Sequence, residues 1–218
     1  MEEKTLSEGS KLEIIDHLRG GNKHTYYSVI SDIIDASTFD IAAPLEKGII
    51  IPLEIGKEYE CIFITIYGLF RCQVVMEKRY VENNLHFLRM KVITQIAKYQ
   101  RRGFYRLDVV FDFRYYNQLT NRWKEATTLD ISGNGIRCIS NEDLSKGTRV
   151  LCELKLEIEK KVYTISNLAE VIDSTVVNLA DRRYETRWVF VDIPMNKQDI
   201  IIKFIYDEQR RRLKRESR

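Results

Sequence analysis

Two arginines, Arg102 and Arg106, lie four residues apart in the segment QRRGFYR of residues 100–106. This spacing places both side chains on the same side of an extended chain, and it also makes them neighbours on a helical turn. A guanidinium group is a planar fork of donors that suits phosphate oxygens and the O6/N7 edge of guanine, and its flat face stacks on aromatic rings. The pair indicates a phosphate-containing ligand, although solvated arginines at a junction between domains also explain the pair taken alone.

A second polar segment, DISGNG at residues 130–135, follows a strand expected at residues 123–129. Asp130 can accept hydrogen bonds from N1 and N2 of guanine, and Ser132 offers a hydroxyl group. The two glycines of the segment permit a positive φ and a close approach of the backbone to a ligand. The same residues are typical of an Asx turn between two strands, and this structural explanation stays open for the segment alone.

The elements that must position these segments are mainly β-strands. Residues 148–158 alternate apolar and polar side chains, which is typical of a strand with one buried and one exposed face. Strands are expected at residues 48–53, 59–66, 70–76, 85–93, 107–115, 123–129, 148–158, 162–165, 168–172 and 184–191. Residues 200–205 carry an apolar stripe of helical spacing, and Asn196 can cap this helix. The predicted fold class is mainly β, with two small β-barrels in tandem and a C-terminal helix on the second.

Composition excludes several classes of protein. Apolar residues make up 44% and charged residues 31% of the 218 residues, which excludes a disordered or collagen-like chain. No run approaches the roughly 18 apolar residues of a membrane span, and the acidic N-terminal segment is unlike a signal peptide. A cytoplasmic protein without membrane insertion is therefore expected. Its four cysteines, Cys61, Cys72, Cys138 and Cys152, are expected to be reduced and buried.

Catalytic and cofactor motifs are absent from the sequence. It contains no glycine-rich phosphate loop, dinucleotide-binding motif, zinc-protease motif or nucleophile elbow. The three histidines are scattered, and no pair of acids is marked out for acid/base chemistry. The net charge is −2 for residues 1–98 and +5 for residues 99–218, an excess too small for a nucleic-acid polymer as partner. The sequence indicates a binding protein rather than an enzyme, with no metal and no cofactor.

Taken together, R-x-x-x-R at Arg102 and Arg106 and D-x-S-x-x-G at Asp130, Ser132 and Gly135 resemble the signature of the PilZ domain. The resemblance covers residues 99–218. The first half resembles the β-barrel that precedes PilZ in flagellar-brake (YcgR-like) proteins, although it has no sharp motif. The resemblance implies a first domain at residues 1–95, a linker at residues 96–106 that carries the arginine motif, and a PilZ-type barrel at residues 107–218.

The PilZ family binds the bacterial second messenger cyclic di-GMP, and the resemblance implies the same ligand here. The implied ligand contacts are Arg101, Arg102, Arg106, Asp130, Ser132 and Gly135, with Gln100, Gly133 and Asn134 as further contacts. In the family, an arginine at the position of Arg101 is associated with binding an intercalated ligand dimer, because a further guanidinium can neutralise a second pair of phosphates. The resemblance also implies that the ligand changes the arrangement of the two domains, and that the liganded protein acts on flagellar motor or switch proteins.

Two alternatives from other classes stay open. A ligand-independent adaptor with a PilZ-like fold would act through protein contacts alone, but such family members usually lack the motif arginines. A single-stranded RNA-binding module is suggested by the segment RGFYRL at residues 102–107, which is similar to an RRM signature. That match fails where a central aromatic is required, because Arg106 occupies the position.

Overall fold

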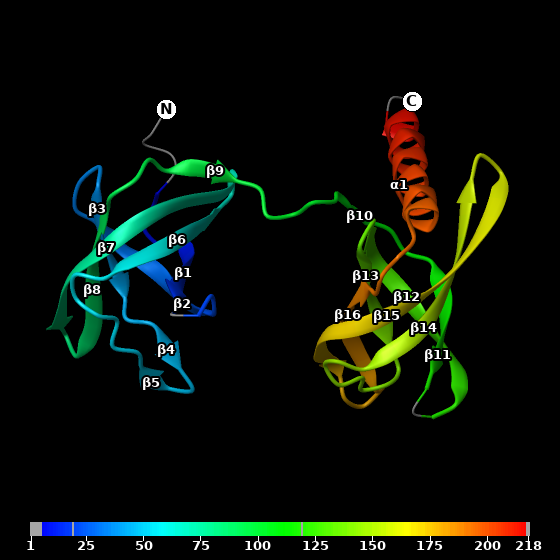
Figure 1. The fold of residues 1–218 in the computed structure, drawn as a ribbon, viewed down its shortest axis with the longest axis horizontal. Coiled ribbons are helices and arrows are strands. Elements are labelled where there is room, and N and C mark those ends of the chain that lie inside the picture. Colours follow the sequence, from blue (N-terminus) through cyan, green and yellow to red (C-terminus); the bar gives the residue numbers. More distant parts are fainter. Residues whose placement is uncertain (1–5, 19, 119, 217–218) are drawn as a thin grey trace. The chain divides into compact units, whose positions relative to one another are not determined.

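The computed structural model describes residues 6–18, 20–118 and 120–216, and it divides the chain into two compact units, Met1–Arg101 (unit 1) and Arg102–Arg218 (unit 2). Figure 1 shows that each unit is built on its own β-sheet, and that the one helix among the described residues follows the last strand of unit 2. The prediction of a mainly β protein with two barrels and a C-terminal helix is confirmed. Residues 1–5 and 217–218, at the outer ends of the two predicted domains, lie outside the described residues.

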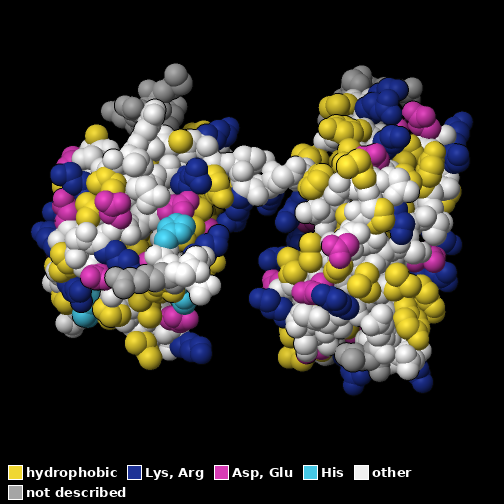
Figure 2. Space-filling view, viewed as in Figure 1, with side chains coloured by type: hydrophobic (Ala, Val, Ile, Leu, Met, Phe, Trp, Pro, Cys, Tyr) yellow, Lys and Arg dark blue, Asp and Glu magenta, His cyan; other side chains and the backbone are white. Residues whose placement is uncertain are grey.

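Unit 1 contains a closed barrel of six antiparallel strands, and its described residues form three further short strands outside the ring. Its strands are β1 (Lys11–His17), β2 (Lys23–Ile33), β3 (Thr38–Ala42), β4 (Leu45–Glu46), β5 (Ile49–Ile50), β6 (Glu58–Thr65), β7 (Gly68–Glu82), β8 (Leu85–Val92) and β9 (Ala97–Tyr99). The ring runs β6-β1-β2-β3-β8-β7, and pairing of β6 with β7 closes it. Strand β9 extends the sheet by pairing with the start of β7, while β4 and β5 form a separate hairpin. Figure 2 shows hydrophobic side chains on this hairpin, where Leu45 and Ile49 are exposed.

Unit 2 repeats the closed ring with different connections. Its elements are β10 (Arg106–Asp108), β11 (Asp112–Asn117), β12 (Arg122–Ser132), β13 (Gly135–Ser140), β14 (Arg149–Ile158), β15 (Lys161–Asn178), β16 (Arg183–Phe190) and α1 (Met195–Glu216). The ring runs β12-β11-β14-β15-β16-β13, and pairing of β12 with β13 closes it. Short β10 adds to the far end of β12. A closed ring leaves no unpaired strand edge within it.

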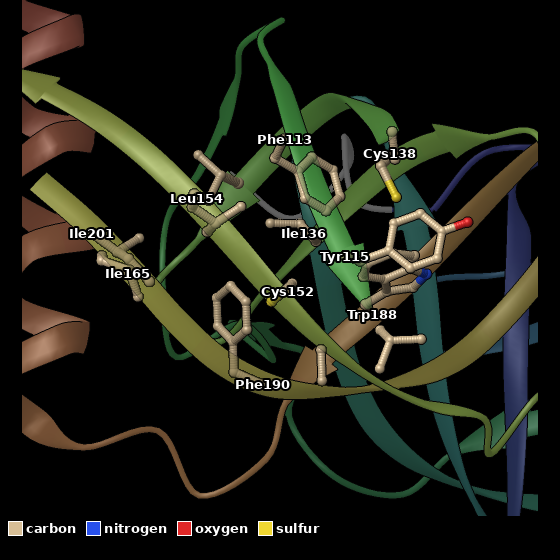
Figure 3. Packing of buried hydrophobic residues seen from close by; sticks show 14 of the residues in the cluster. Phe113, Tyr115, Ile136, Cys138, Cys152, Leu154, Ile165, Trp188, Phe190 and Ile201 are labelled. Carbon is tan, nitrogen blue, oxygen red and sulfur yellow. The ribbon is translucent and has the colours of Figure 1, made fainter. Parts of the chain in front are cut away.

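The core of unit 2 is organised around Trp188, which is only 2% exposed (Figure 3). The rings of Phe113 and Tyr115 meet it edge to face, with centroids 5.5 and 5.0 Å away, a favourable geometry for aromatic pairs. Helix α1 adds Ile201 and Phe204 to the same cluster, so its predicted apolar stripe is the face that packs on the barrel. This packing rather than helix propensity stabilises the helix.

All four cysteines are free and buried, as the composition predicted. Burial raises the pKa of Cys72, Cys138 and Cys152 to about 12, because the thiolate would lose its hydration. Burial, with a smaller contribution from Cys72, raises the pKa of Cys61 as well. The thiols therefore serve as packing groups and remain protonated at neutral pH.

The structure differs from the sequence expectation where strands bend. Residues 107–115, expected as one strand, form β10 and β11 with a break between them. At the break, the hydroxyl of Thr128 donates to the carbonyl of Val109 and accepts from the amide of Phe111, so a side chain takes part in the contact between the strands there. Conversely, residues 162–165 and 168–172 belong to one long strand, β15. Six strands had not been predicted: β1, β2, β3, β4, β9 and β13.

Candidate functional site

Strand register joins the two motifs of the sequence. Strand β10 pairs with the end of β12, so that Arg106 lies directly opposite Ser132 and Asp108 opposite Asp130. On its other side the end of β12 pairs with β13, which places Ser132 opposite Gly135 and Asp130 opposite Arg137. Arg106 of the first motif therefore meets Asp130, Ser132 and Gly135 of the second motif on three neighbouring strands.

A hollow on unit 2 lies at this meeting point. Five of the nine predicted contact residues line it: Arg106, Asp130, Ser132, Asn134 and Gly135. The remaining lining residues are Ile136, Arg137, Ile172, Arg187, Trp188 and Val189. Among all the lining residues three are arginines, Arg106, Arg137 and Arg187, so the hollow presents guanidinium groups beside the single carboxylate of Asp130.

Asp130 is held in place by an arginine that the sequence analysis did not single out. Its carboxylate, only 10% exposed, accepts from Nε of Arg137 at 2.6 Å. The hydrogen bond that Arg137 donates to Asp130 raises the pKa of Arg137 against the opposing effect of burial, and the negative charge of Asp130 adds to this increase. The contact uses Oδ2, and no described residue donates to Oδ1. One carboxylate oxygen thus fixes the orientation of Asp130, and the other is free for a ligand.

The arginines of the hollow continue into a small network. Nη1 of Arg137 lies 3.4 Å from Glu185, and Arg187 contacts Asp173 at 3.0 Å. Arg187 is the direct cross-strand partner of Arg137 in the pairing of β13 with β16. Arg137 could have been found from the sequence, because it lies two residues after Gly135 and residues two apart in a strand share a face. Arg187 depends on the pairing of β13 with β16, which no local pattern reveals.

The turn of the second motif is held by its own residues. Ser132 donates its hydroxyl to the carbonyl of Gly135 at 3.2 Å, and it accepts from the amide of Asn134 at 3.4 Å. The side chain of Gln198 on α1 donates to the carbonyl of Gly133 at 3.1 Å. The structural explanation left open for this segment is thus partly realised, because Ser132 closes the turn and also lines the hollow.

The reason given for the two glycines is wrong in one respect, since neither Gly133 nor Gly135 has a positive φ. A Cβ at Gly135 would lie 2.2 Å from the carbonyl oxygen of Trp188, so the glycine permits close approach of β13 to β16. A Cβ at Gly133 would lie 2.6 Å from the ring of Phe104. Both glycines therefore make room for neighbouring parts of the protein.

The remaining predicted residues lie in the segment before β10. Arg102 is exposed, begins unit 2 and does not line the hollow. Gln100 and Arg101 belong to unit 1, where Gln100 is exposed and Arg101 pairs with Glu13 at 2.8 Å. The structure thus brings Arg106 into the site and leaves Arg101 with a partner in unit 1.

The part of the chain that the structure describes contains neither a cluster of metal ligands nor a helix that could span a membrane. Within residues 6–18, 20–118 and 120–216, no group of three or more His, Cys, Asp or Glu side chains could hold a metal ion. Helix α1, the one helix in the described part of the chain, is not apolar enough to cross a membrane.

Comparisons with known proteins place this geometry in context. No curated protein sequence matches that of this chain. Among solved structures, the Bacillus subtilis inhibitor of motility (MotI/DgrA) is similar over 94% of this chain and 98% of its own, with 16% identity and a TM-score of 0.79. YcgR from Escherichia coli in complex with cyclic di-GMP matches 96% of this chain and 88% of its own, with 12% identity and a TM-score of 0.48. MrkH of K. pneumonia in complex with cyclic di-GMP matches 95% and 90%, with 14% identity and a TM-score of 0.45.

The similarity to the motility inhibitor extends over both units, so that protein has the same two-barrel fold. At the level of sequence, residues 100–207 match the family described as PilZ domain. This stretch contains both motifs and every residue that lines the hollow. Residues 100–207 therefore form a domain of the PilZ family.

Proposed function

We propose that this protein is a receptor for cyclic di-GMP, a binding protein rather than an enzyme, and that the ligand occupies the hollow between β10, β12 and β13. The observation that carries the proposal is the strand register that sets Arg106 opposite Ser132, next to Asp130. Membership of the PilZ family supports the choice of ligand, and the arginines of the hollow match its two phosphates.

Each contact has a chemical role in this proposal. Asp130 accepts from N1 and N2 of a guanine through Oδ1, while Arg137 holds its other oxygen. Arg106 donates to a phosphate or to the O6/N7 edge of a guanine, and Arg102 joins it from the preceding segment. Ser132, Asn134 and Gly135 form the floor on the barrel side, and Gly133 and Gln100 remain as further contacts.

We further propose that Arg101 allows a second ligand molecule to bind, so that an intercalated dimer occupies the site. A guanidinium next to the first motif arginine supplies charge for a second pair of phosphates, whose mutual repulsion otherwise opposes a dimer. A titration that gives two ligands per chain in the wild type and one in Arg101→Ala supports this stoichiometry, and one ligand in both overturns it.

The output of binding is proposed to be a change in how the two barrels are arranged, which alters contacts with flagellar motor or switch proteins in the bacterial cytoplasm. The segment of residues 96–106 is the proposed linker, and ligand contacts at its arginines bias its conformation through differential affinity for one state. The fold shared with an inhibitor of motility supports a role in swimming control.

The binding proposal is tested by calorimetric titration of cyclic di-GMP into the wild type, Arg106→Ala and Arg149→Ala. Arg106→Ala should lower the affinity about tenfold to a hundredfold, since a charge-assisted hydrogen bond contributes roughly 1.5–3 kcal/mol. Arg149→Ala is the control, because this arginine of the same unit pairs with Glu170 and does not line the hollow.

Equal affinities in all three proteins would remove Arg106 from the site. A wild type that binds no cyclic di-GMP would overturn the receptor function and favour the ligand-independent adaptor. Binding of random RNA oligonucleotides that cyclic di-GMP fails to displace would favour the RNA-binding module instead.

A further inference from the structure

A buried carboxylate of unit 1 holds Arg101, the arginine that directly precedes the first motif. Glu13 lies in β1 between Leu12 and Ile14, which both point into the barrel core, so its own side chain is on the outer face. The side chain is nevertheless only 11% exposed. Its direct neighbour on β6 is Ile62, which is 3% exposed. Glu13 is therefore an anion in a largely dehydrated, partly apolar setting, where an unpaired charge is costly.

Arg101 supplies the missing counter-charge. Its Nη1 donates to both carboxylate oxygens of Glu13, at 2.8 Å to Oε1 and 3.1 Å to Oε2. The Arg101 side chain itself is 47% exposed, so it can leave this position without disturbing a packed core. Glu13 and Arg101 are 88 residues apart in sequence, and the contact ties the last residue of unit 1 to its first strand.

We propose that Glu13 competes with cyclic di-GMP for Arg101, and so acts as an internal anion that sets the affinity of the receptor. This inference rests on the proposed function. The carboxylate of Glu13 and a ligand phosphate are both anionic oxygen acceptors that suit the same guanidinium. A ligand that recruits Arg101 must break the pair and leave Glu13 without its counter-charge. The cost of that step is subtracted from the observed binding free energy.

The competition predicts that removing the charge of Glu13 strengthens binding. Glu13→Gln keeps the size of the side chain but weakens its hold on Arg101. We expect cyclic di-GMP to bind Glu13→Gln about fivefold more tightly. This factor corresponds to the largest contribution that a partly exposed ion pair usually makes to a free energy. In an Arg101→Ala background the same substitution should have no effect on affinity, because there is no arginine left to release.

The matched control is Glu60→Gln. Glu60 lies in β6 of the same barrel, its side chain is 13% exposed, and it pairs with His17 at 2.8 Å and with Arg71 at 3.5 Å. It therefore matches Glu13 in burial and charge but does not hold Arg101. The affinity of the Glu60→Gln variant for cyclic di-GMP should equal that of the wild type.

A second readout needs no ligand. Trypsin must take the side chain of Arg101 into its own pocket to cut after this residue, so the pair with Glu13 protects the bond. The fraction of early cuts after Arg101, relative to cuts after Arg102 in the same digest, should rise about threefold in Glu13→Gln and stay unchanged in Glu60→Gln. Mass spectrometry of the fragments separates the two sites.

The outcomes separate the two proposals. If the wild type and Glu13→Gln bind cyclic di-GMP equally, or if the variant binds more weakly because Glu13 orients Arg101, the competition is wrong while the receptor function stands. An unchanged cleavage ratio shows that the ion pair does not hold Arg101 in solution, and this also overturns the competition. If the wild type binds no cyclic di-GMP, the receptor function fails and the competition fails with it.

Discussion

Replacing Gly135 with alanine should destabilise unit 2 more than any other glycine substitution near the site. The added Cβ would lie 2.2 Å from the carbonyl oxygen of Trp188 and 3.2 Å from Cα of Val189. Both neighbours are backbone atoms of β16, the direct partner strand of β13, so no side-chain rotation relieves the clash. The two strands must separate by about 1 Å to restore ordinary contact, which weakens their hydrogen bonds.

The magnitude follows from these two effects. Overpacking in a dense interior costs about 1–3 kcal/mol, and one weakened backbone hydrogen bond adds about 1 kcal/mol. The free energy of unfolding of unit 2 should therefore fall by about 2–4 kcal/mol. For a domain of this size, this corresponds to a decrease in Tm of about 8–16 °C.

Two further glycines serve as controls. The three atoms nearest to a Cβ at Gly133 belong to the ring of Phe104, a side chain that can move, so Gly133→Ala should cost less than Gly135→Ala. A Cβ at Gly103 would have no atom within 4 Å, so Gly103→Ala should leave stability within about 0.5 kcal/mol of the wild type.

Intrinsic fluorescence during thermal unfolding measures this effect on unit 2 alone, because the two tryptophans of the chain, Trp123 and Trp188, both belong to it. If Gly135→Ala unfolds within 2 °C of the wild type, or if Gly133→Ala is the more damaging of the two, the role assigned to Gly135 is refuted.

Two other predictions concern Arg137 and Asp40. Arg137→Met should lower the affinity for cyclic di-GMP about tenfold, because Asp130 loses the donor at 2.6 Å that orients it, and titration calorimetry measures the loss; an unchanged affinity would show that Asp130 needs no such partner. Burial would raise the pKa of Asp40, but hydrogen bonds from Arg89 and Tyr80 outweigh it and lower the pKa. Asp40 therefore stabilises unit 1 at pH values above its pKa in the unfolded chain, about 4, and this contribution should disappear as the pH falls below that value. Acid unfolding followed by circular dichroism should show a weaker pH dependence in Asp40→Asn, and identical acid transitions would contradict this assignment.

Local patterns predicted those parts of the fold that depend on local physics. The alternation of residues 148–158 and the apolar stripe of residues 200–205 each reflect one element with one buried face, and both elements are present as β14 and α1. The meeting of Arg106 with Asp130 and Ser132 was also predictable. Strand pairing could not be inferred from the sequence, but both segments resemble motifs of one family, and this resemblance implied that they form one site.

Features that depend on register were out of reach of the sequence. Arg187 enters the hollow because β16 pairs with β13, and Gly135 is needed because Trp188 lies across from its strand. The pair of Glu13 with Arg101 joins two residues that no pattern relates. In each case the deciding contact comes from a distant segment, and a one-residue shift in pairing would have changed it.

The four buried thiols have a practical consequence for measuring how the two units move. Maleimide reagents attack exposed thiolates, and the native cysteines are both covered and protonated at pH 7. One new cysteine at an exposed position of each unit can therefore carry a fluorophore without removal of the native cysteines. Energy transfer between two such dyes would report directly whether the messenger draws the barrels together, on a chain whose packing is intact.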